Sequence, residues 1–127
     1  MNIALWALQL LLALLFGFAG FLKSTAPISQ LAQTGITWAP DLPVALVRFI
    51  GIAELAGALG LILPAATRIA PSLTPLAAAG LTLVMLLATI FHVARGEMMN
   101  VPMTLILGLI AATIAWGRLR KAPIAPR

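Results

Sequence analysis

The chain has 127 residues, of which 62% are hydrophobic and only 9% are charged. Soluble domains are about half apolar and about one-quarter charged, so this composition excludes an ordinary soluble domain, whose surface needs many more polar groups. The net charge of +5 does not indicate nucleic-acid binding, because half of the basic residues crowd into positions 118–127, beside an apolar segment, and form no basic face along a folded domain.

Four apolar stretches follow one another along the chain, at residues 2–22, 43–63, 75–94 and 101–117. A helix needs about 20 such residues to cross the roughly 30 Å hydrocarbon core of a bilayer. The first stretch has no basic residue before its apolar run and is longer than the core of a secretory signal, so we interpret it as a retained helix. Pro64 is predicted to end the second. The pattern predicts an all-α fold, a transmembrane four-helix bundle that forms a single domain.

The loop between the first two stretches is too long for a simple turn and predicts a short helix. Ser24 or Thr25 is expected to cap this helix, Pro27 suits its first position, and Gly35 suits its end. With Trp38 following, the segment is expected to lie in the membrane interface. It could act there as a lid or as a passive connector.

The distribution of Lys and Arg predicts an orientation. Residues 118–127 hold four of them and the second loop holds Arg68, whereas Lys23 and Arg95 in the first and third loops are each offset by an acidic residue. Because cytoplasmic segments carry the excess of positive charge, we expect both termini and the second loop to lie in the cytoplasm, with 118–127 as a basic tail.

Glu54 is the most informative residue of the sequence. If the second helix begins near Pro43, Glu54 lies roughly 16 Å along it, where an ionisable side chain costs about 3 kcal/mol. Protonation, or pairing with a cation, would lower that cost. Gly51, Gly57 and Ala58 share its helix face, and small residues allow close approach of another helix, so the carboxyl group is predicted to face the bundle interior. It could exchange protons or hold a ligand, or it could fix the helix packing.

Further polar residues are predicted to gather on the outward side with Glu54. Lys23 ends the first stretch, Arg48 lies near the start of the second, His92 lies near the end of the third, and Asn100 precedes the fourth. Arg48 could snorkel to the interface or bind an anion, a carbonyl group or a carboxylate. His92 could transfer protons or polarise a carbonyl group, or it could be an ordinary interfacial residue. We predict one cavity that opens outward, with Glu54 several ångströms deeper than His92.

Other features of the stretches indicate packing. Small residues form seams at Ala13, Gly17 and Gly20 in the first stretch and at Gly108 and Ala112 in the fourth. Gln9 and Thr104 are predicted to hydrogen-bond between helices. The chain lacks cysteine and has a single histidine, so it forms no disulfide, no thiolate metal site and no bis-histidine haem within one chain, and we predict no metal.

Two sequence runs resemble a known family. The run VRFIGIAELAGALGLILP covers Val47–Pro64, the run GLTLVMLLATIFHVARGE covers Gly80–Glu97, and Asn100 follows. Together with Lys23, they resemble the DoxX-like family of small four-helix membrane proteins over nearly the whole chain. The resemblance implies a bacterial inner-membrane protein linked to respiratory or quinone chemistry. Some relatives are associated with thiol oxidation, which this chain without cysteine cannot perform alone.

Three functional hypotheses remain open from the sequence. The leading one is a redox-linked accessory subunit that interacts with quinone or a similar lipophilic molecule, without a covalent cofactor. Glu54 and His92 would bind or protonate the headgroup, while Lys23, Arg48 and Asn100 would contribute to ligand binding. The second is a structural subunit that docks a redox enzyme or forms a homo-oligomer. The third is a small proton-coupled exporter, although the carboxylate of such a protein would be expected in its first helix.

Overall fold

The computed structural model describes residues 1–127 and is all-α, as the sequence predicts. The helices are α1 (Asn2–Thr25), α2 (Ile28–Gln33), α3 (Val44–Thr67), α4 (Leu73–Ala94) and α5 (Val101–Trp116). Short helical turns η1 (Ala39–Asp41), η2 (Met98–Asn100) and η3 (Gly117–Lys121) complete the fold. The short helix predicted in the first loop is present as α2.

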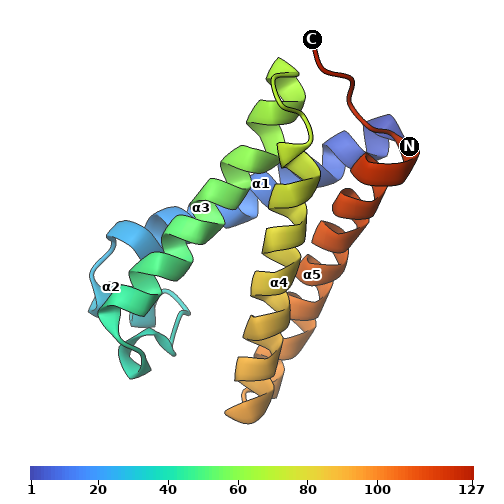
Figure 1. Ribbon diagram of the computed structural model, residues 1–127. Helices are drawn as coiled ribbons and strands as arrows, with labels where there is room; N and C mark the ends of the chain where they lie inside the picture. Colours follow the sequence, from blue (N-terminus) through green and yellow to red (C-terminus); the bar gives the residue numbers. More distant parts are fainter.

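The four long helices form two antiparallel pairs. In Figure 1, α1 lies along α3 and α4 lies along α5, and the two pairs diverge toward the end of the molecule that carries α2. The pairs are joined nearer the opposite end by a core that includes Leu12, Phe16, Leu61, Leu81 and Ile114. A smaller cluster beneath the first loop, with Leu31 and Val47, attaches α2 to α3. The diverging end is therefore where the bundle has room for a site.

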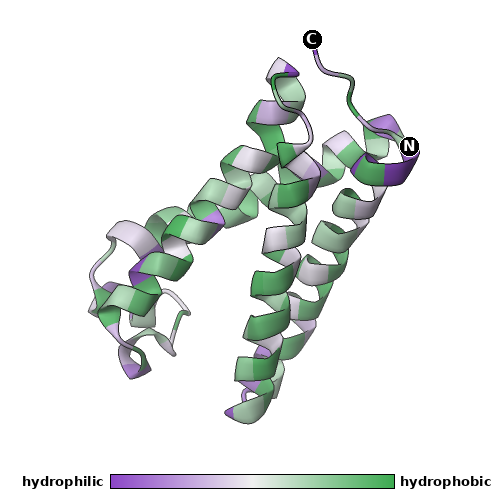
Figure 2. Ribbon diagram, in the orientation of Figure 1, coloured by the Kyte–Doolittle hydropathy of each residue, from purple (hydrophilic) through white to green (hydrophobic).

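The outer surface of the bundle is apolar. Phe18, Phe49, Leu76 and Leu109 are each at least 65% exposed. Figure 2 shows hydrophobic residues along all four long helices, with the most hydrophilic residues concentrated toward the ends of the molecule. Four helices are long and apolar enough to cross a membrane, the last formed by Met98–Lys121 as one continuous segment. Because water would oppose so much exposed apolar area, these surfaces contact lipid.

Two glycines bring α1 and α3 into backbone contact. A Cβ atom on Gly20 would lie 2.6 Å from the Leu55 nitrogen, and one on Gly51 would lie 2.6 Å from the Ser24 nitrogen. No side chain fits at such distances, so both positions require glycine. The prediction that small residues mark helix contacts is confirmed here, and this crossing determines where the end of α1 lies against α3.

The prediction that Pro64 ends its helix is wrong, because α3 continues to Thr67. Proline has no N–H to donate to the carbonyl four residues earlier, which belongs to Gly60. That carbonyl accepts a hydrogen bond from the Thr74 hydroxyl of α4 instead, at 2.9 Å. A carbonyl with a substitute donor no longer requires the helix to stop, and this hydrogen bond joins α3 to α4.

The ends of two helices also differ from the sequence expectation. Ser24 and Thr25 do not cap α2, because α1 continues through both and their hydroxyls bond to the Phe21 carbonyl of their own helix. The last helical segment extends beyond its predicted end near residue 117. It continues through the π-helical turn η3, in which Arg118 is 3% exposed.

Thr74→Val should lower the free energy of unfolding by about 1 to 3 kcal/mol, because it leaves the partly buried Gly60 carbonyl without a donor. In a Pro64→Ala background the new backbone N–H can bond to that carbonyl, so the same substitution should cost much less. Unfolding of the four proteins in mixed micelles measures both effects. Equal costs of Thr74→Val in the two backgrounds would contradict this account.

Candidate functional site

An ion pair joins α1 to α3 inside the bundle. Lys23 Nζ lies 2.8 Å from Glu54 Oε1, and the side chains are only 12% and 2% exposed. Lys23 is in the last turn of α1, where a cation is favoured by the helix dipole, and the glycine crossing brings this turn beside α3. The Lys23 ammonium also lies 5.4 Å from the centre of the Trp38 ring. The Glu54 carboxylate thus faces the bundle interior and has a cation of its own.

Arg48 holds the end of α1 rather than facing the same space. Its Nη1 donates to the Lys23 carbonyl at 3.0 Å and to the Ala26 carbonyl at 2.6 Å. The last carbonyls of a helix have no partner within the helix, so the guanidinium group serves as the cap of α1. Among the partners considered for Arg48, carbonyl groups are those it contacts, and it positions Lys23 through the backbone.

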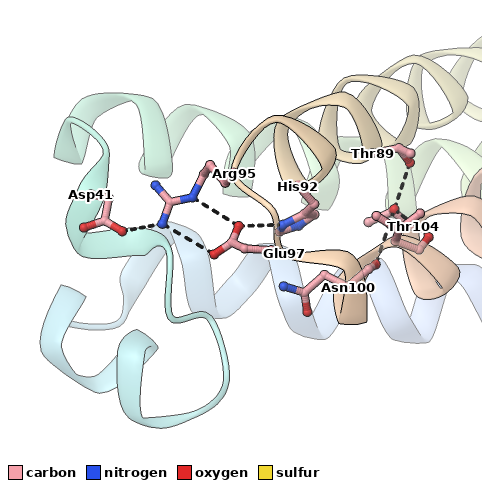
Figure 3. Close-up of polar contacts among 8 residues, drawn as sticks. Asp41, Thr89, His92, Arg95, Glu97, Asn100 and Thr104 are labelled. Atoms are coloured by element: carbon pink, nitrogen blue, oxygen red, sulfur yellow. Dashed lines mark hydrogen bonds and ion pairs between the residues drawn. The ribbon is translucent and has the colours of Figure 1, made fainter.

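A chain of polar contacts runs from His92 to the first loop (Figure 3). His92 Nδ1 lies 3.0 Å from Glu97 Oε1, which also accepts from Arg95 Nε at 3.1 Å. Arg95 Nη2 in turn donates to Asp41 Oδ2 at 2.6 Å. Asp41 belongs to η1, beside α3, so the contact links the two diverging helix pairs at their open end.

Local backbone geometry places Glu97 against His92. Gly96 has φ of +73°, a conformation that favours glycine, and it turns the chain back at the end of α4. The Glu97 N–H then bonds to the His92 carbonyl at 2.8 Å. The hydrogen bond from His92, with additional help from Arg95, lowers the pKa of Glu97 below its ordinary value of 4.5. Glu97 is therefore ionised at neutral pH and keeps a proton on His92 Nδ1.

A second polar contact pairs α4 with α5. The Thr89 hydroxyl donates to the Thr104 hydroxyl at 2.8 Å (Figure 3). The Thr104 hydroxyl also bonds to the Val101 carbonyl. The predicted contacts between helices at Thr104 and Gln9 are confirmed, since Gln9 donates to the Leu61 carbonyl at 2.6 Å. The bond between Thr89 and Thr104 holds α5 against α4 beside the site.

Two cavities flank the polar centre, the group formed by Lys23, Glu54 and His92. One, of about 340 Å³, lies between α3 and α4 and is mostly apolar, with Phe49 and Phe91 in its wall. The other, of about 200 Å³, lies between α1, α4 and α5 and includes Asn100. Six residues line both cavities: Lys23, Trp38, Glu54, Met85, Ala88 and His92. The same few polar groups can therefore be reached from two sides of the bundle.

The cavities bring together four of the five residues singled out in the sequence. Lys23, Glu54 and His92 line both, Asn100 lines the smaller, and Arg48 lines neither. Glu54 and His92 form no direct hydrogen bond with each other. The structure has no group of three or more histidine, cysteine or acidic side chains placed to hold a metal ion.

Three features of the site were not found by sequence reasoning. These are the direct pairing of Lys23 with Glu54, the contact of Glu97 with His92, and the place of Trp38 in the cavity wall. The sequence held a signal for Glu97, because a glycine followed by an acid just after a helix-ending histidine fits a left-handed helix terminus. The position of Trp38 depends on how the loop folds back, and no local pattern indicates it.

The model of the DoxX-like family matches residues 7–114, which include most of both helix pairs together with Lys23, Glu54, His92 and Asn100. The chain belongs to the DoxX-like family. The resemblance identified from the sequence is thus confirmed, and the protein is a DoxX-like membrane protein. No curated protein and no solved structure matches the chain. The family match identifies no ligand, so the role of the site rests on its geometry.

Lys23→Met should destabilise the protein by about 3 to 5 kcal/mol, because it leaves the Glu54 carboxylate buried without its cation. Adding Glu54→Gln to this variant removes the unpaired charge and should restore part of the loss. Denaturation in mixed micelles measures both. A double variant no more stable than Lys23→Met would contradict a coupled pair.

Glu97→Gln should lower stability at neutral pH but not in acid. A carboxyl group whose pKa is lowered by folding stabilises the protein above its ordinary pKa, and the contribution is lost as the pH falls through the folded-state value. The difference in thermal midpoint between the native chain and Glu97→Gln should thus shrink as the pH falls below about 4.5. A difference that does not change with pH would contradict the assignment of this carboxylate.

Proposed function

We propose that this protein is a redox-linked accessory subunit of the bacterial inner membrane that binds quinone or a similar lipophilic molecule at the Lys23, Glu54 and His92 centre. The observation that supports the role most is the position of these groups between two cavities in the lipid-exposed part of the bundle. A quinone needs hydrogen-bonding groups at its ring and an apolar surface along its tail, and the site offers both.

The larger cavity suits the apolar part of such a ligand. Its volume of about 340 Å³ lies within the usual range of small-molecule sites, roughly 300 to 1,000 Å³. Leu46, Phe49 and Leu87 in its wall are each more than 40% exposed at the lipid-facing surface. A molecule dissolved in the bilayer could therefore reach the polar centre between α3 and α4 without crossing water.

The polar groups suit the two oxidation states of a quinone headgroup. Because Glu97 holds the proton on His92 Nδ1, the free ring nitrogen is Nε2. Nε2 accepts a hydrogen bond from a quinol hydroxyl when the ring is neutral, and donates to a quinone carbonyl when it is protonated. Lys23 is a second donor, and its pairing with Glu54 keeps the centre close to neutral overall. Asn100 adds an amide group at the smaller cavity.

The proposed orientation has both termini in the cytoplasm and the site on the outward side. The end opposite the site carries five basic residues, and cytoplasmic segments carry the excess of Lys and Arg. A redox enzyme docked at the outward face would then exchange quinone or quinol with this centre.

A structural role for the same residues is the second candidate. The Lys23 and Glu54 pair joins α1 to α3, and Arg95 with Asp41 joins the two helix pairs, so the polar centre also stabilises the fold. As a purely structural subunit, the protein would lose stability or partner assembly with these substitutions and would have no ligand to lose.

Quinone binding can be measured through Trp38, which lines both cavities, after Trp6 near the start of α1 and Trp116 at the end of α5 are replaced by Phe. A short-chain quinone should quench Trp38 fluorescence saturably, because quinones are efficient quenchers. His92→Ala removes a hydrogen bond to the headgroup, and Glu54→Gln leaves the Lys23 charge without its counter-charge, so each should weaken the apparent affinity by about tenfold or more.

Thr82→Ala is the matched control for His92→Ala. Thr82 lies on the same helix, but its hydroxyl bonds only to the Ala78 carbonyl of α4 and it lines neither cavity. Its affinity should stay within about twofold of the parent. If the quinone does not quench, or if the site variants and the control bind alike, the quinone role is excluded and the structural one is favoured.

A further inference from the structure

The end of the molecule opposite the site carries cations without acidic partners. All three acidic residues, Asp41, Glu54 and Glu97, are paired with Lys23, Arg95 or His92 toward the diverging end. At the other end, Figure 2 shows strongly hydrophilic residues around the end of the last helix, beside the N-terminus. The basic residues there are Arg68, Arg118, Arg120, Lys121 and Arg127.

One of these cations, Arg118, is buried among neutral groups. Its Nε donates to Gln9 Oε1 at 2.7 Å, and its Nη1 donates to Asn2 Oδ1 at 2.7 Å. The guanidinium group lies 5.5 Å from the centre of the Trp6 ring. Its Nη2 is buried and has no hydrogen-bond partner. A buried charge without a counter-charge is costly, and no side chain of this protein supplies one here.

A cavity of about 390 Å³ adjoins Arg118 at this end. Its wall combines Arg118 and Leu119 with Ser72 and Thr74 at the start of α4, and with Pro123 of the C-terminal segment. No acidic side chain lines it. The first N–H groups of α4 already bond to the preceding turn, so the helix contributes the positive end of its dipole rather than free donors.

We propose that this cavity binds the phosphate group of an anionic phospholipid, with Arg118 as the counter-charge. The positive end of α4 adds to the attraction. Leu73, Leu76 and Leu119 are each at least 47% exposed and offer apolar surface on which the acyl chains can lie. The headgroup would bridge α4 and η3, and so lock the second helix pair at its closed end. This site is separate from the polar centre and does not rest on quinone binding.

A carboxylate placed inside the cavity tests the site with little risk to the fold. Ser72 is the exposed N-cap residue of α4, and aspartate is at least as good there as serine, so Ser72→Asp should fold. Its negative charge would neutralise Arg118 and repel a phosphate. Ser72→Asn is the matched control, because asparagine also caps a helix but carries no charge.

Purified full-length protein in a neutral detergent should bind one phosphatidylglycerol per chain by native mass spectrometry, with a rise in thermal midpoint. Ser72→Asp should weaken this binding by about tenfold or more, because like charges oppose each other across the cavity. Ser72→Asn should bind as the native chain does. Arg118→Gln should also weaken binding, whereas Arg120→Gln, an equal loss of charge at an exposed position, should change it less than about twofold.

Two further titrations identify the source of the phosphate. Phosphatidylcholine, which has no net charge, should bind at least about tenfold more weakly than phosphatidylglycerol. If inorganic phosphate alone stabilises the protein and Ser72→Asp abolishes the effect, the site stands and its ligand is a soluble phosphate. The site is overturned if Ser72→Asp keeps the native affinity for phosphatidylglycerol, if Ser72→Asn loses it equally, or if both phospholipids bind alike.

Discussion

The ion pair between Lys23 and Glu54 is the interaction on which the site depends. An ionised carboxylate within an apolar bundle is costly unless a cation lies against it, and the cation here comes from the last turn of another helix. The end of α1 must therefore be held against the middle of α3. Gly20 and Gly51 permit that approach, and Arg48 secures the end of α1 by bonding to its free carbonyls.

The same constraint explains why cavities form at this end of the bundle. The backbone contact of α1 with α3 makes one tight pair, and α4 with α5 makes another, but the pairs diverge where the polar groups lie (Figure 1). Polar side chains need partners that a close-packed apolar interface would not provide. His92 and Glu97 face the space from the second pair, and the Arg95 contact with Asp41 keeps the pairs linked. The site is thus an opening between two closely packed helix pairs.

Charge is divided between the two ends of the molecule. Every acidic side chain pairs with a basic one near the proposed site, which leaves the basic side chains of the opposite end without acidic side chains as partners. Arg118 lies at that end but is buried, and its guanidinium group bonds to Gln9 and Asn2 of α1. This division accounts both for the predicted orientation and for the proposed phosphate site.

Much of the fold could be predicted from the sequence, because long apolar runs and small-residue seams act locally. Four helices, the short α2 and the inward direction of Glu54 followed from these signals. The helix boundaries near Pro64 and Thr25 could not be predicted from these signals. Thr74, a partner from another helix, rescues the Gly60 carbonyl, and helix α1 simply extends further than its apolar run. A sequence pattern cannot show such tertiary rescue.

The residues of the site could be predicted from the sequence, but their contacts could not. These four residues could be identified because polar side chains within apolar helices are costly and therefore rare, and the antiparallel topology placed them at one end: Lys23, Glu54, His92 and Asn100. Their partners could not be selected. Whether Lys23 met Glu54, or Arg48 met a carbonyl, depended on the helix crossing at Gly20, which is a matter of packing between distant segments.

The most direct measurement of the central claim is mass spectrometry of the lipophilic molecules that copurify with the gently solubilised protein. The native chain should retain a quinone, and Glu54→Gln, which disrupts the pair with Lys23, should retain much less of it while keeping its helical content. The claim would be contradicted if both proteins carried the same lipophilic molecules in the same amounts.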